Sequence, residues 1–145
     1  MKMRWIRSLW LAPALLVACA GCGGGDSGPG LNPVRGVVTK SGAPLADAVV
    51  TFYATDPQAL SSGMPVPKGR TDSEGVFELR TFDPGDGAKA GEYAVTIKHV
   101  QSVDTPDGQL IEQDLLKGAY ADRDKPFKVV TVTDGTNDLG TLAIP

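Results

Sequence analysis

Residues 91–100, GEYAVTIKHV, decide the fold because their side chains repeat with a period of two. One face of this segment carries Tyr93, Val95 and Ile97. The other face carries Ala94, Thr96 and Lys98. Strict alternation of this kind predicts a β-strand with one face against a core and the other in water.

The same pattern recurs outward in both directions along the chain. In 76–82, Phe77 and Leu79 alternate with Glu78 and Arg80. The predicted strands cover 34–40, 46–54, 68–71, 76–82, 91–100, 127–133 and 139–144. Turns rich in Gly, Pro and Asp separate them, and no long helical pattern interrupts them. Seven short strands of this type predict an all-β fold, an antiparallel β-sandwich.

The strand pattern also predicts the core and two long connections. Nine side chains are expected on the inner faces: Phe52, Phe77, Leu79, Tyr93, Val95, Ile97, Val130, Val132 and Leu142. The segment 55–67 contains three prolines and is expected to be a loop. The longer segment 101–126 is predicted to be an acidic loop with one helical turn, which packs Leu115 and Tyr120 over a sheet edge.

The first 22 residues differ in composition from the rest. Lys2, Arg4 and Arg7 form a positive start, and residues 10–18 form an apolar run that Pro13 interrupts. Small residues follow. This order predicts an export signal, which is too short to span a bilayer as a mature helix. The Gly-rich segment 23–33 that comes next is predicted to be a flexible tether.

The two cysteines, Cys19 and Cys22, both lie in this leader. The segment LVAC, ending at Cys19, resembles the lipobox of bacterial lipoproteins, in which a cysteine after a small residue is diacylated. Cys22 is a second candidate, although Cys19 stands three positions before it where Leu is usual. The pattern ranks Cys19 slightly above Cys22. Two acyl chains give a stable anchor, since each buried methylene contributes about 0.8 kcal/mol.

Four segments of the body resemble the carboxypeptidase regulatory-like, or transthyretin-like, family. GVV at 36–38 is followed by GAPLADAVVTF at 42–52, which looks like the opening strand, turn and Val-rich strand of that family. TDSEGVFEL at 71–79 matches its Thr-Asp-x-x-Gly-x-Phe-x-Leu hairpin. GEYAVTI at 91–97 matches its Gly-x-Tyr-x-Val-x-Ile strand. The segments 120–122 and 130–137 are similar to the tail of a bacterial lipoprotein version.

This resemblance covers residues 34–145 and implies a prealbumin-like, seven-stranded Greek-key β-sandwich. In carboxypeptidases such a domain is an accessory module without catalytic residues. The resemblance therefore implies a non-catalytic role and defines the fold better than the function.

Residue chemistry does not favour an enzyme. His99 is the single histidine and is expected at a strand end, on the solvent-facing side, and both cysteines belong to the leader. Asp72 with Glu74, and Asp83 with Asp86, are interpreted as turn-capping residues rather than calcium ligands. We expect no metal and no cofactor. The net charge of −3, without a basic block in the body, disfavours nucleic acid.

These observations predict a module of the bacterial cell envelope, lipid-anchored on the periplasmic or outer surface of a membrane. Its expected role is structural, or an interaction with an envelope protein. The alternative is a glycan- or peptide-binding module that uses the 55–67 and 101–126 loops. Because both tryptophans lie in the leader, stacking on a sugar would depend on Tyr53, Tyr93 and Tyr120.

Overall fold

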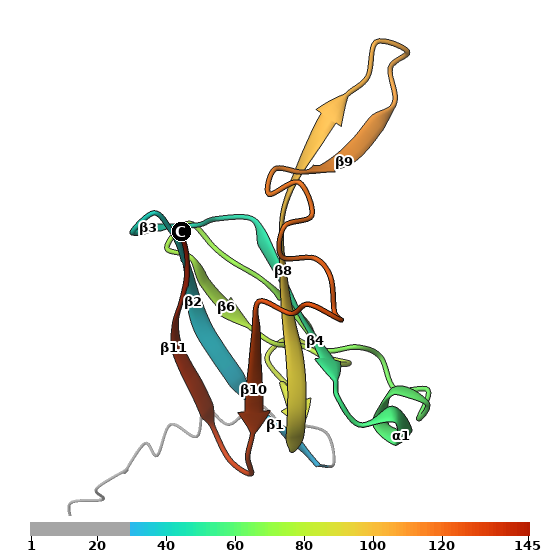
Figure 1. Ribbon diagram of the computed structural model, residues 1–145, viewed down its shortest axis with the longest axis vertical. Helices are drawn as coiled ribbons and strands as arrows, with labels where there is room; N and C mark the ends of the chain where they lie inside the picture. The colour runs from blue at the N-terminus through green and yellow to red at the C-terminus, as the bar shows by residue number, and fades with distance from the viewer. Residues whose placement is uncertain (1–29) are drawn as a thin grey trace, which may run out of the picture.

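The computed structural model of the chain describes residues 30–145, and the regular secondary structure there is almost entirely β (Figure 1). The strands are β1 (Leu31–Asn32), β2 (Val34–Lys40), β3 (Ala43–Pro44), β4 (Ala48–Ala54), β5 (Lys68–Arg70), β6 (Val76–Glu78), β7 (Ala88–Lys89), β8 (Gly91–Asp104), β9 (Leu110–Asp114), β10 (Lys128–Val132) and β11 (Asn137–Ile144). The short helix α1 (Pro57–Leu60) lies between β4 and β5. Each of the seven expected strands has a counterpart, but β6 ends at Glu78 rather than at residue 82 and β8 runs to Asp104 rather than to residue 100. Strands β1, β3, β7 and β9 are additional, so the expected count of seven is not confirmed.

Two main sheets form the sandwich. One has the order β10–β8–β4–β5, and β9 pairs with the far part of β8. The other has the order β11–β2–β3, and β6 also pairs with β2. A two-stranded ribbon of β1 and β7 lies beside them. The predicted all-β, antiparallel sandwich is confirmed, since every pairing but one among residues 30–145 is antiparallel.

The exception is the parallel pair of β2 and β11. These two strands lie near opposite ends of the described sequence. A parallel pair needs a long connection, and here the whole body of the domain supplies it. At another edge Lys68 and Arg80 form a bridge that links β5 to the segment after β6. This bridge connects the two sheets along one side of the sandwich.

The core lies between the two sheets and contains all nine of the expected inner-face residues. Phe52 and Tyr93 pack together with ring centroids 5.7 Å apart. Phe77 lies beneath Gly36, where an added Cβ would come within 2.9 Å of the ring. A glycine at position 36 therefore makes room for the largest side chain of the TDSEGVFEL segment.

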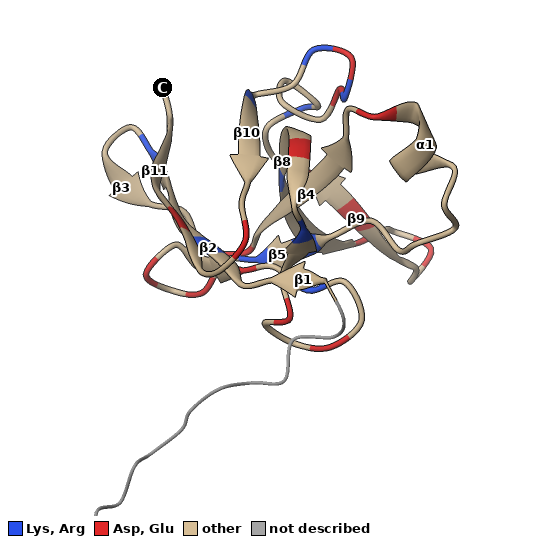
Figure 2. Ribbon diagram, turned by 90° about the horizontal axis from the view of Figure 1, so that it is seen from below, with Lys and Arg blue, Asp and Glu red and all other residues tan. Residues whose placement is uncertain are grey.

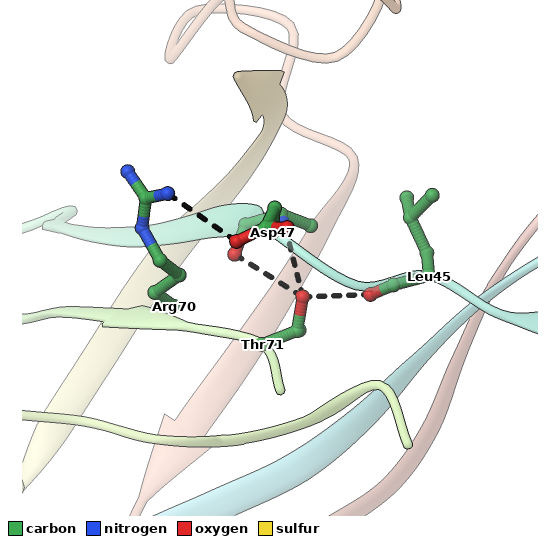
Figure 3. A network of polar contacts seen from close by, with 5 residues as sticks. Leu45, Asp47, Arg70 and Thr71 are labelled. Atoms are coloured by element: carbon green, nitrogen blue, oxygen red, sulfur yellow. Dashed lines mark hydrogen bonds and ion pairs between the residues drawn. The ribbon is translucent and has the colours of Figure 1, made fainter. Parts of the chain in front are cut away.

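A polar contact secures the turn before β4 to the end of β5 (Figure 3). The Thr71 hydroxyl donates to the Leu45 carbonyl at 2.6 Å and accepts from the Ala48 N–H at 2.8 Å. Beside it, Arg70 and Asp47 form an exposed ion pair at 3.5 Å. The hydroxyl, which is buried, thus satisfies backbone groups that the turn leaves without strand partners.

The prediction for 101–126 is wrong in its first half. Strand β8 continues to Asp104 and returns through a turn into β9, which gives a hairpin that projects beyond the sheets (Figure 1). The turn is closed by the Thr105 N–H on the Gln109 carbonyl at 2.8 Å. Because neither face of the hairpin packs on the core, its sequence lacks the apolar alternation that reveals a strand. Leu115 is exposed, whereas Tyr120 does pack against the core.

The boundary predicted for the tether is also wrong at its end. Leu31 and Asn32 are buried and pair with Lys89 and Ala88. The side chain of Asn32 accepts from the Gly135 N–H at 2.8 Å. The predicted export signal, most of the tether, and both Cys19 and Cys22 lie outside the described residues. Within residues 30–145 no helix is long and apolar enough to cross a bilayer.

Candidate binding hollow on the outer face of the first sheet

The face of the β10–β8–β4–β5 sheet that points away from the core carries a broad, open hollow of about 710 Å³. We call it the outer-face hollow. It is lined by Val49, Thr51, Tyr53, Pro65, Val66, Lys68, Arg80, Thr81, Thr96, Lys98, Val100 and Glu112. Strands β4 and β8 form the floor. Pro65 and Val66, from the 55–67 loop, and Glu112, from β9, border it. The structure therefore brings the two predicted binding segments to one surface.

Strand register determines which side chains share this floor. Thr51 of β4 lies opposite Lys68 on one side and Thr96 on the other. Val49 likewise lies between Arg70 and Lys98. Directly opposite residues project from the same face of a sheet, at about 5 Å across the strand pair. Cations from β5 and β8 thus flank a floor of hydroxyl and apolar groups.

Lys68 and Arg80 are neighbours across a hydrogen-bonded antiparallel pair. The Lys68 N–H donates to the Arg80 carbonyl at 3.0 Å, and the Arg80 N–H donates back at 2.9 Å. In such a pair both side chains project from one face, so two like charges lie side by side. The ion pairs among residues 30–145 are Arg35–Asp138 and Arg70–Asp47, and neither involves Lys68, Arg80 or Lys98.

Thr96 differs from the other buried polar side chains of the sandwich. Asn32, Thr71, Thr81, Asp86 and Asn137 all bond to backbone groups and hold turns or loops. Thr96 is only 3% exposed and lines the hollow, yet its side chain takes part in none of the hydrogen bonds of residues 30–145. Since no fully inaccessible polar side-chain atom there lacks a partner, the Thr96 hydroxyl retains access to the hollow.

The burial of Thr96 and Ala94 corrects the prediction that this side of β8 is solvent-facing. Ala94 is also buried, and only Lys98 among the three expected outer residues is exposed. Strand β8 is central, with β4 on one side and β10 on the other, so short side chains lie below the level of their neighbours. The sequence identifies the alternation but not which outer positions are covered by neighbouring side chains.

A second, smaller cavity of about 220 Å³ lies beneath the 55–67 loop. Its lining is mainly apolar and includes Phe52, Leu60, Met64, Pro67 and Tyr93. The predicted loop contains helix α1, whose N-terminus is capped by the Asp56 carboxylate accepting from the Gln58 N–H at 2.9 Å. This cap and the following turn hold the loop over the sheet edge.

The three tyrosines proposed for sugar stacking have separate environments. Tyr53 is half-buried in the outer-face hollow. Tyr93 is buried, and its hydroxyl donates to the Lys89 carbonyl at 3.0 Å. Burial raises the pKa of the Tyr93 phenol above its usual value. Tyr120 packs edge-on against Phe127, with centroids 5.6 Å apart. Only Tyr53 therefore faces the hollow.

His99 does not lie where the sequence predicted. Because β8 continues to Asp104, His99 is inside the strand rather than at its end, and it is half-buried. It lies opposite Ala48, a core residue, and so belongs to the inner side of the sheet. Its backbone N–H donates to the Asp114 carboxylate at 2.9 Å.

Two of the four carboxylates considered as calcium ligands, Asp72 and Asp86, cap turns. Asp72 accepts from the N–H groups of Glu74 and Val76, each at 2.9 Å. Asp86 accepts from three consecutive N–H groups, those of residues 81–83, at 2.7 to 2.9 Å. Within residues 30–145 no three His, Cys, Asp or Glu side chains are grouped as metal ligands. In Figure 2 the acidic residues lie largely on the loops around the sandwich.

Opposing effects act on the Asp86 carboxyl. Burial raises its pKa, but the three N–H donors, assisted by the positive charge of Arg80, more than offset this and leave the pKa below its usual value. The side chain is 5% exposed, so these donors act in a largely desolvated site. Asp86 is therefore a structural anion that holds the loop between β6 and β7.

Sheets, core and hollow together define the described part of the chain as a β-sandwich domain. No family model matches the chain, and no curated protein does. Among solved structures, it is similar to a 9R-lipoxygenase of Cyanothece, with 22% identity over 80% of this chain and 17% of that chain, at a TM-score of 0.44. It is also similar to BcpA, the major pilin subunit of Bacillus cereus, with 15% identity over 78% of this chain and 29% of that chain, at a TM-score of 0.44.

A third similarity is to a candidate carbohydrate-binding protein of Pseudomonas aeruginosa, with 15% identity over 77% of this chain and 88% of that chain, at a TM-score of 0.40. The chain spans less than a third of the length of the lipoxygenase and of the pilin. Similarities this low concern the fold alone.

The lining of the outer-face hollow includes residues that sequence reasoning did not select. Lys68, Arg80, Thr51 and Thr96 have no motif and come from four separate segments. The available signal was the alternation along the chain: Thr51, Lys68 and Thr96 occupy outward positions of their strands, and Arg80 continues the alternation of β6 just beyond its end. Alternation says nothing about which outward residues of different strands become neighbours.

Proposed function

We propose that this protein is a lipid-anchored module of the bacterial cell envelope whose β-sandwich has an interaction role rather than a catalytic one. The observation that supports the interaction role is the projecting β8–β9 hairpin. Leu110 at its tip is 73% exposed, and Ile111 and Leu115 are also exposed. Among residues 30–145 strand β9 pairs with β8 alone, so its other edge has backbone donors and acceptors without a strand partner there. Exposed apolar groups beside an open strand edge are features of surfaces that bind another protein.

A second candidate function is binding of a glycan or peptide. The observation that favours it is the outer-face hollow, because the 55–67 loop and strand β9 border the same surface. This is the pair of segments that the sequence singled out. Strand β9 takes part in both surfaces, but the exposed Ile111 does not line the hollow, so variants of individual residues can separate the two candidates.

We also propose membership of the carboxypeptidase regulatory-like family. Support comes from the way in which its motif segments pack. Phe77 of the predicted hairpin contacts the Gly36 site of the opening strand. Gly75 has φ +76°, and an added Cβ would lie 2.5 Å from the Val38 carbonyl. Positive φ and close approach both require glycine at that turn.

The lipid anchor is tested with Cys19→Ala, Cys22→Ala and the double variant. Loss of the acylated cysteine is expected to move the protein from the membrane to the soluble fraction, since the acyl chains provide the membrane affinity. Mass spectrometry of the mature N-terminus identifies which cysteine carries lipid. If the double variant stays in the membrane fraction, the anchor proposal is wrong.

The interaction role is tested with a photo-crosslinking residue at position 111 in the full chain, expressed in cells. A discrete crosslinked envelope protein is expected from position 111 but not from position 40, which is exposed at the end of β2. Equal products from both positions would contradict a specific role for the hairpin.

A further inference from the structure

We propose that the outer-face hollow binds a carboxylate-bearing saccharide of the uronic acid class, through Lys68, Arg80, Lys98 and the hydroxyl of Thr96. This inference deepens the second candidate function and depends on it. It requires neither the lipid anchor nor the hairpin to act as proposed.

Charge is the first argument. The chain as a whole is acidic, with a net charge of −3, yet three cations and one acid line this hollow. Lys68 and Arg80 lie opposite each other, and like charges in that arrangement destabilise a strand pair. Within residues 30–145 the Arg80 side chain forms one weak hydrogen bond, to the Phe82 carbonyl at 3.5 Å, and its positive charge also acts on the Asp86 carboxylate. A carboxylate between these side chains would relieve the repulsion and form charge-assisted hydrogen bonds.

The second argument is the floor. Thr96 is buried, lines the hollow and has a hydroxyl that no residue of 30–145 engages. Thr51 lies directly opposite it, and Tyr53 is two residues further along β4. Because this hydroxyl is accessible from the hollow, a ligand bound there can form a hydrogen bond with it. Adjacent hydroxyls and one aromatic ring suit the hydroxyl groups and the ring face of a sugar.

The third argument distinguishes a saccharide from an acidic peptide. A peptide in extended form binds by adding a strand to a free sheet edge, through backbone hydrogen bonds. The floor strand β4 is central, and its backbone groups already pair with β8 and β5. The hollow therefore offers a ligand hydrogen-bonding groups of side chains rather than of the backbone. A saccharide, which has no amide backbone to satisfy, fits this lining better.

The test is calorimetric titration of the full chain, purified in neutral detergent, with tetragalacturonic acid. Saturable binding is expected, and it should weaken as ionic strength rises. Lys68→Gln and Lys98→Gln should each weaken binding by about tenfold or more, equivalent to about 1.4 kcal/mol. Lys40→Gln, at an exposed lysine on the other sheet, should leave affinity unchanged. Thr96→Val should weaken binding, and Thr96→Ser should restore it.

Stability provides an independent readout. Because Lys68→Gln removes one of two facing like charges, it is expected to leave the thermal midpoint unchanged or raise it while binding falls. A merely structural role for Lys68 would lower the midpoint instead. Thermal unfolding of every variant also shows whether a loss of binding reflects a loss of fold.

Three results would overturn the inference. They are no saturable binding of tetragalacturonic acid up to about 10 mM, equal binding of its methyl ester, and equal or tighter binding of tetraglutamate. The last result would favour an acidic peptide and leave the second candidate function intact. If no probe binds but a specific crosslink forms at position 111, the proposed binding function of the hollow is wrong and the proposed interaction role of the hairpin stands.

Discussion

The Thr71 hydroxyl accepts a 2.8 Å hydrogen bond from the backbone N–H of Ala48. It also donates to the Leu45 carbonyl, so one side chain ties the end of β5 to the turn that starts β4. Asp47, within that turn, has φ +57°, an uncommon conformation for a residue other than glycine. The buried hydroxyl thus holds a turn that the chain would otherwise not favour.

Thr71→Val should therefore destabilise the domain by about 1–3 kcal/mol, because two buried backbone groups lose their partner. Urea unfolding followed by circular dichroism measures the change. The matched control is Thr136→Val at an exposed position, which should change stability by less than about 0.5 kcal/mol. Equal effects at both positions would show that the Thr71 hydroxyl is not a structural link.

The core assignment is tested with two phenylalanines. Phe77 is 1% exposed, and Phe77→Ala should cost about 3–5 kcal/mol through lost burial and the cavity left behind. Phe82, only five residues away, is 54% exposed, and Phe82→Ala should cost well under about 1 kcal/mol. A loss below about 1 kcal/mol for Phe77→Ala would refute the inner-face assignment.

Alanine substitutions at two glycines distinguish the stability cost of backbone strain from that of a steric collision. Gly63 and Gly87 both have positive φ, +71° and +83°. A Cβ at Gly63 would meet nothing within 4 Å, whereas one at Gly87 would collide with the Asn32 carbonyl. Gly63→Ala should thus cost only the conformational penalty of about 1–2 kcal/mol. Gly87→Ala should cost more and disrupt the β1–β7 ribbon, measured by urea unfolding and amide exchange at Asn32.

Acid should weaken the domain partly through Asp86. Its pKa is lowered in the folded state from the ordinary value of 3.8. The stability that it contributes is therefore fully present above that ordinary value and is lost as pH falls through the lower, folded-state pKa. Asp86→Asn should reduce stability at pH 7, and its difference from the natural chain should shrink as pH falls through this window.

Urea unfolding of both proteins between pH 7 and about pH 2 measures that difference. Other carboxyls, including Asp138, whose pKa is lowered by the Gly140 N–H and by Arg35, contribute to both curves and cancel. A difference that stays constant across this range would show that the Asp86 carboxylate has no special role.

Elements with a buried face were predictable, and elements without one were not. The apolar alternation in β8 located Val95 and Ile97 in the core before any pairing was known. The extension of β8 to Asp104 and the strand β9 have no buried face, so they left no comparable signal. Strand β1 was missed for a different reason: Leu31 is buried, but a two-residue strand is too short for a period of two to appear.

The sequence by itself determined that the body is a β-sandwich and which side chains fill it, because alternation along a strand is a local property that needs no partner. Only the tertiary structure decided which outward residues meet. The facing of Lys68 and Arg80, and of Thr51 and Thr96, depends on the register between strands. That register follows from the packing of the whole core and from turn geometry, neither of which is encoded in any one segment.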